Sequence, residues 1–130
     1  MTNNKGYLVN KDNEKLFPDQ YDSGWIYPTL ENGWNNSSAH ASPVRYRKIG
    51  NVVYIAGSIT GGTFRSTIFT LPVGFRPGGN YQVTLIRATA GYARLHINYD
   101  GKNNGRVILE NVDGTNEEVS LFNISFIAEY

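Results

Sequence analysis

Apolar and polar residues alternate with a period of two in short segments along most of this chain. Such alternation is typical of β-strands with one buried face, whereas an amphipathic helix repeats about every 3.6 residues. From residue 24 onward the strand-like segments recur every 8–12 residues or so, as in a β-sandwich or barrel. The predicted strands are Trp25–Leu30, Val44–Ile49, Val52–Thr60, Thr67–Leu71, Tyr81–Arg87, Tyr92–Tyr99, Arg106–Asn111 and Val119–Ala128.

Turn residues separate these segments. Gly50-Asn51 predicts a tight hairpin, and Gly57, inside a predicted strand, permits a bulge or the close approach of another backbone. The segment Leu71–Pro77 contains two prolines, which cannot donate to a strand ladder, so it should end a strand and turn the chain away. Phe75 within it is expected to fill the core. The longest predicted loop is Glu31–Pro43.

Strand faces predict what each strand contacts. Along residues 92–99 the core face consists of Ala93, Leu95, Ile97 and Tyr99. The opposite, polar face consists of Tyr92, Arg94, His96 and Asn98. The strands at 52–60 and 119–128 are apolar on both faces, which is typical of strands buried on both sides. In a small sandwich this favours either a subunit interface or an inner strand covered by a loop.

These patterns predict an all-β fold, a jelly-roll-like antiparallel β-sandwich of about eight strands. Residues 1–22 are expected to form an N-terminal arm with a short hairpin and a linker, and residues 23–130 the sandwich head. In the arm, Tyr7–Val9 and Leu16–Phe17 flank a polar turn, and Pro18 ends the second of these segments. A chain of 130 residues suits one head domain.

Composition narrows the functional classes. Twelve basic and eleven acidic residues give a net charge of +1, which does not favour nucleic-acid binding. The absence of cysteine excludes disulfides and thiolate metal sites. No apolar run reaches the roughly 20 residues that span a bilayer, so we expect no membrane insertion. The N-terminus also lacks the apolar stretch of a signal peptide.

Catalytic and metal-binding patterns are weak. Most acidic residues fall in predicted turns and only Glu110 lies inside a predicted strand, so no pair of carboxylates suggests a glycosidase. The two histidines, His40 and His96, have no nucleophile motif beside them. The loop Asp100–Gly105 is too rich in glycine and lysine to match a calcium loop. We therefore expect no catalysis, no metal and no cofactor.

Three motifs in a fixed order carry a family resemblance. They are PVRYRKIGNVVYIAGSITGG at 43–62, TLPVGFRP at 70–77 and SLFNISFIAEY at 120–130, preceded by Gly24-Trp25 and Asn32-Gly33-Trp34. Together they resemble the C-terminal head module of tail and baseplate fibres from phages of Gram-positive bacteria. The resemblance spans residues 23–130 and implies a homotrimeric, non-catalytic β-sandwich head in the virion. It also implies a host wall polysaccharide or teichoic acid as receptor, with other baseplate proteins contacting the arm.

Two functions remain open, a receptor-binding head and a structural upper-fibre module that docks other tail proteins. Saccharides bind on aromatic platforms flanked by polar groups, and cationic side chains would contact the phosphates of a teichoic acid. The predicted platforms are Trp34, Tyr92 and Tyr99. The predicted polar partners are Arg94, His96, Asn98 and Asp100. Trp25 is expected to pack in the core instead.

Overall fold

The computed structural model describes residues 10–13, 21–38, 42–86, 91–111 and 118–130. Within these ranges the chain forms ten β-strands and no helix, and every pair of neighbouring strands is antiparallel. The strands are β1 (Asn35–Asn36), β2 (Arg45–Ile49), β3 (Val52–Ala56), β4 (Ser58–Thr60), β5 (Thr67–Thr70), β6 (Tyr81–Ile86), β7 (Tyr92–Ile97), β8 (Arg106–Asn111), β9 (Val119–Ser120) and β10 (Ile124–Ile127). No described segment could cross a membrane as a helix.

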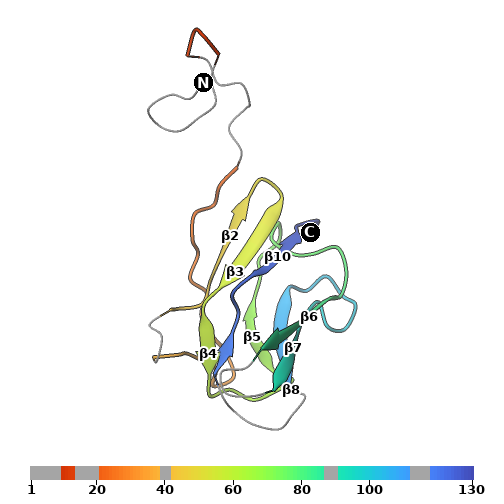
Figure 1. Cartoon of the computed structure of the whole chain (residues 1–130). Helices are drawn as coiled ribbons and strands as arrows, with labels where there is room; N and C mark the ends of the chain where they lie inside the picture. Colours follow the sequence, from red (N-terminus) through yellow and green to blue (C-terminus); the bar gives the residue numbers. More distant parts are fainter. Residues whose placement is uncertain (1–9, 14–20, 39–41, 87–90, 112–117) are drawn as a thin grey trace.

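The described strands form three sheets. A short one is ordered β1-β4-β9, and the sandwich consists of the other two, ordered β10-β3-β2 and β5-β8-β7-β6 (Figure 1). Their inner faces share one hydrophobic core, to which Ile55 and Ile124 contribute from the first sheet and Leu95 and Leu109 from the second. The ring of Tyr46 on β2 stacks on that of Phe69 on β5, with centroids 6.0 Å apart. Alternation along the strands places these side chains inward. The predicted all-β antiparallel sandwich is therefore confirmed.

A bend at Gly57 divides one predicted strand into β3 and β4. Gly57 has φ 111, and a Cβ atom there would lie 2.5 Å from the carbonyl oxygen of Pro43. The predicted close approach of another backbone is confirmed, and no other residue type fits. The partner strand is divided into β9 and β10 at the same level. Ile55 and Ser58 are three positions apart in the sequence, whereas the residues paired with them, Ile124 and Ser120, are four positions apart. The strand made up of β9 and β10 therefore contains one extra residue, which forms a β-bulge.

The predicted strand at Trp25–Leu30 is wrong. Only Ile26 pairs there, in an isolated bridge with Tyr46 on β2. Pro28 has no backbone N–H to continue such a ladder, which limits the pairing. The extra strand is β1, which pairs with β4 and lies inside the predicted loop at Glu31–Pro43. The structure divides two of the eight predicted strands, lacks one of them and adds one, which gives ten strands.

The segment Leu71–Pro77 ends β5 as predicted. The N–H of Phe75 donates to the carbonyl of Pro72 at 3.1 Å, which closes a turn. Phe75 then packs edge-on against Tyr46 at 5.4 Å, so its predicted place in the core is confirmed. The Arg76 side chain donates to the carbonyl oxygens of Leu71 and Asn103. The motif thus ties the end of β5 to a loop of the second sheet.

The N-terminal arm is described in two pieces. Residues 10–13 form the predicted polar turn, in which the N–H of Asn13 donates to the carbonyl of Asn10 at 3.0 Å. The flanking segments Tyr7–Val9 and Leu16–Phe17 lie outside the described residues, as does His40. Tyr21 and Asp22, assigned above to the arm, already pair with the β2–β3 hairpin of the head.

Candidate functional site

The predicted polar face on β7 is only partly exposed. Tyr92 and Arg94 are open to solvent, but His96 is 3% exposed and Asn98 is fully buried. The prediction that these last two side chains meet a ligand is therefore wrong. The amide of Asn98 donates to the carbonyl oxygens of Pro77 and Gly79 at 3.0 and 3.1 Å. Its Oδ1 accepts from the N–H of Gly105 at 2.8 Å, so Asn98 connects loops.

His96 belongs to an ion-pair cluster. Its Nε2 lies 3.1 Å from Oε2 of Glu110, which also contacts Arg65 at 3.3 Å and Arg94 at 3.8 Å. The hydrogen bond with His96 lowers the pKa of Glu110, and the nearby guanidinium groups of Arg65 and Arg94 add to the effect. The edge of the Tyr99 ring packs on His96, with centroids 4.7 Å apart. Arg94 and His96 therefore both contact Glu110 on the neighbouring strand β8.

The remaining predicted site residues divide between surface and core. Tyr99, placed above on the core face, is half exposed, and Asp100 is exposed and accepts from Asn104 at 2.8 Å. Trp34 is 4% exposed and packs edge-on against Phe64 at 5.7 Å. A Cβ atom at Gly62 would lie 1.9 Å from the Trp34 ring, so the backbone touches the indole. Trp34 therefore belongs to the core and provides no saccharide platform.

Trp25 has the opposite environment and is 40% exposed. The expectation that it packs in the core is wrong. Its ring lies 4.9 Å from the guanidinium carbon of Arg45 and 5.7 Å from that of Arg47. The ring forms one wall of an open hollow of about 410 Å³, which we call the Trp25 pocket. The pocket is lined by Trp25, Arg45, Tyr54, Ile55, Ala56, Phe122, Asn123, Ile124 and Ser125.

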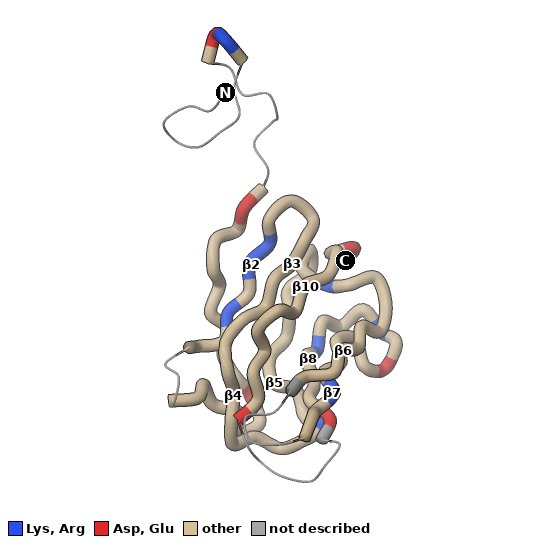
Figure 2. Tube along the Cα trace, viewed as in Figure 1, with Lys and Arg blue, Asp and Glu red and all other residues tan. Residues whose placement is uncertain are grey.

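Strand alternation brings Arg45, Tyr54 and Ser125 to the outer face of the β10-β3-β2 sheet. Arg45 and Arg47 point outward from β2, because Tyr46 between them is buried in the core. The basic residues of β2 are drawn in blue in Figure 2. Tyr54 lies opposite Arg47 in the register and is 41% exposed. Phe122 comes from the bulge between β9 and β10, where its ring also lies 5.8 Å from the guanidinium carbon of Arg45.

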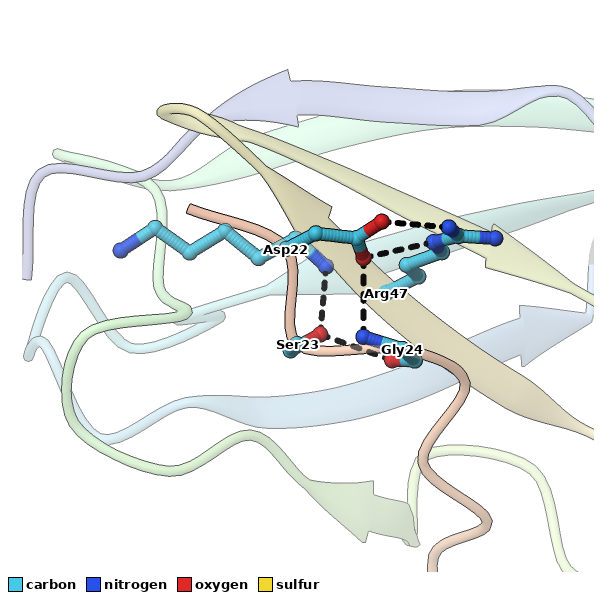
Figure 3. Close-up of polar contacts among 5 residues, drawn as sticks. Asp22, Ser23, Gly24 and Arg47 are labelled. Atoms are coloured by element: carbon cyan, nitrogen blue, oxygen red, sulfur yellow. Dashed lines mark hydrogen bonds and ion pairs between the residues drawn. The ribbon is translucent and has the colours of Figure 1, made fainter. Parts of the chain in front are cut away.

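Residues 21–26, which we call the strap, hold Trp25 beside β2. Asp22 accepts two hydrogen bonds from Arg47, at 2.9 Å from Nε and 2.5 Å from Nη2 (Figure 3). The hydrogen bonds from Arg47 and from the N–H of Gly24 lower the pKa of Asp22 to about 2. The hydroxyl of Ser23 accepts from the N–H of Lys48 at 2.9 Å. These bonds fix the backbone on both sides of the turn that leads into Trp25.

The electrostatics of the pocket are uneven. Asp22 neutralises Arg47, and Lys48 donates to the carbonyl of Gly74 at 2.7 Å. Arg45 donates through Nη1 to the carbonyl of Pro43 at 2.9 Å and to the Ser42 hydroxyl at 3.3 Å. In the described part of the chain no carboxylate pairs with Arg45. Among the described residues, the pocket thus combines aromatic walls with one cation that no carboxylate pairs.

Comparisons with known proteins support the fold. No protein-family model matches this chain, and a search of curated proteins found no match. Among solved structures, the chain is similar to the receptor binding protein (gp15) of Listeria phage PSA, with a TM-score of 0.68. The match covers 86% of this chain and 68% of the phage protein, at 19% sequence identity. This chain has the fold of a phage receptor-binding protein.

None of the residues that line the Trp25 pocket is among the predicted site residues, and the missed side chains include Trp25, Arg45, Tyr54 and Phe122. Two features of the sequence could have indicated this site, namely the basic strand Arg45–Lys48 and Trp25, which follows a glycine. Alternation along that strand places both arginines on one face, opposite Tyr46. The position of Trp25 beside them depends on the strap, which forms no regular strand and which periodicity therefore does not locate. Among the described residues, no group of three acidic or histidine side chains could hold a metal.

Proposed function

We propose that this chain is the receptor-binding head of a phage tail or baseplate and that it binds a host cell-surface saccharide without catalysis. The observation that carries the proposal is the fold match to a phage receptor-binding protein over 86% of the chain. The Trp25 pocket supplies a site of suitable size, since ligand pockets commonly enclose about 300–1,000 Å³.

The chemistry of the pocket suits a saccharide. The faces of Trp25 and Tyr54 can contact the C–H groups of a sugar ring. Asn123 and Ser125, which also line the pocket, offer an amide and a hydroxyl that can hydrogen bond to sugar hydroxyls. No reacting group is required for such binding, which agrees with a non-catalytic adhesion role in the virion at the host surface.

The proposal includes a homotrimer in which the arm contacts other baseplate proteins. The outer face of β10 supports an assembly, because Ile127 is 62% exposed there. A trimer would scatter light as three copies of a 14.5 kDa chain. A monomeric mass at micromolar concentration would remove this part of the proposal and leave the saccharide site to be tested alone.

The alternative, a structural upper-fibre module, would use the same exposed apolar residues to dock tail proteins. The Trp25 pocket favours the receptor-binding role, because a concave site with a cation and aromatic walls suits a small polar unit better than a flat protein surface. Isolated host walls separate the two functions, since a structural module has no reason to bind them.

The test is binding of labelled protein to Gram-positive cell walls, with and without their teichoic acids and wall polysaccharides. We expect saturable binding that disappears with the glycopolymer. We also expect Trp25→Ala to weaken binding about tenfold through loss of the platform. Tyr27→Ala is the matched control, because Tyr27 is an exposed aromatic nearby in sequence that does not line the pocket. Equal binding by Trp25→Ala and wild type would exclude this pocket.

A further inference from the structure

We infer that the Trp25 pocket selects a saccharide that carries an anionic group, a phosphodiester or a carboxylate, and that Arg45 is the residue that binds it. The inference rests on the proposed function and names the ligand class of that site. The charges of the lining side chains support this inference. Of the described side chains that line the pocket, Arg45 is the single cation and none is acidic.

The neighbouring cations are occupied, which isolates Arg45. Arg47 forms its two-pronged pair with Asp22, and Lys48 donates to Gly74 while its ammonium lies over Tyr21 and Phe75. These contacts are all made within the head, so Arg47 and Lys48 already have partners there. Within the described part of the chain, Arg45 therefore brings a positive charge to the surface hollow without a carboxylate partner.

The guanidinium group of Arg45 is held in place by its neighbours. Its carbon lies 4.9 Å from the ring of Trp25 and 5.8 Å from that of Phe122, so two aromatic rings lie close to it. Nη1 is held by the carbonyl of Pro43 and the hydroxyl of Ser42. A planar group fixed in this way has its remaining N–H donors ready for two parallel hydrogen bonds, which phosphate and carboxylate oxygens accept best.

Covering a cation with a ligand that supplies no opposite charge costs free energy. A neutral sugar seated on Trp25 and Tyr54 would remove water from Arg45 without supplying an opposite charge, which is unfavourable. A cationic ligand would be repelled as well, because the described lining contains no acid. An anionic substituent beside the sugar ring satisfies both the aromatic wall and the guanidinium group.

The experiment measures binding of the full chain to four preparations of one wall glycopolymer. One is native, one has its phosphodiesters methylated to neutral triesters so that the polymer chain stays intact, one has its carboxyl groups reduced to alcohols, and one has both treatments. We expect the doubly treated polymer to bind at least about tenfold more weakly than the native one. The single treatment that reproduces the loss identifies the anion as phosphate or carboxylate.

Variants assign the effect to Arg45. Arg45→Gln should weaken binding to the native polymer about tenfold and remove most of its dependence on salt. Arg45→Lys should retain part of the affinity, since it keeps the charge and loses the planar fork. Arg65→Gln is the control, because it removes the same charge from an exposed loop residue that does not line the pocket. Melting curves of all variants confirm that each is folded.

Three results would overturn the inference, each with a different meaning. If wild type and Arg45→Gln bind native and neutralised polymers equally well, the head binds receptor but selects no anion. If Arg45→Gln changes the molecular mass from trimer to monomer, the pocket joins subunits instead. If wild type binds no wall preparation at all, the proposed receptor-binding function fails together with the inference.

Discussion

Replacing Asn98 by alanine should destabilise the head severely, although the sequence places this residue on a polar, exposed face. Its side chain makes three hydrogen bonds, to Pro77, Gly79 and Gly105, and is fully buried. Loss of three buried hydrogen bonds costs about 3 kcal/mol, at about 1 kcal/mol each. Asn98 also has φ 61, a conformation that costs alanine about 1 kcal/mol more than asparagine.

The sum, about 4 kcal/mol, should lower the melting temperature by roughly 10–20 °C for a domain of this size. The assay is denaturant unfolding of wild type and Asn98→Ala, monitored by tryptophan fluorescence, with calorimetry for the melting temperature. Tyr92→Ala, on the neighbouring strand β7, is the control, since it removes an exposed ring and should cost less than about 1 kcal/mol. An Asn98→Ala protein with the wild-type midpoint would refute the structural role argued for this amide.

Two further changes test the strap and the core. Because the pKa of Asp22 is lowered from 3.8 to about 2 in the folded head, its contribution to stability is complete above pH 3.8 and is lost as the pH falls toward 2. The difference in stability between wild type and Asp22→Asn should therefore be constant near neutral pH and shrink across that acidic window; a difference that grows with acid would contradict the assignment. Trp34→Ala should cost about 3–5 kcal/mol, because it empties a core position, and unfolding of the variant at the wild-type denaturant midpoint would show that Trp34 is not buried as described.

The sheets themselves could be predicted from the sequence because their physical signal is local. Alternation locates most strands, and Gly50-Asn51 joins β2 to β3 by a two-residue turn in which Gly50 has φ 59. Gly57 marks a close backbone approach, as its position inside an apolar run indicates. Each of these features depends on a residue and its near neighbours, so one sequence contains enough information.

The site could not be predicted in the same way, because alternation fails where strands end. β7 stops at Ile97, and the positive φ of Asn98 turns that side chain inward and leaves Tyr99 half exposed. The two tryptophans lie in irregular segments, where periodicity assigns no face. Their burial follows from contacts distant in sequence, such as Gly62 against Trp34 and Arg45 against Trp25.

The central claim, that a host saccharide occupies the Trp25 pocket, is tested most directly by the fluorescence of Trp25 alone. The chain has two tryptophans, so Trp34→Phe leaves Trp25 as the single indole and keeps an aromatic ring in the core. Addition of the wall glycopolymer that the protein binds should shift the Trp25 emission to the blue and protect it from acrylamide quenching. Binding of that polymer with unchanged Trp25 emission and unchanged quenching would contradict the account and place the receptor site elsewhere.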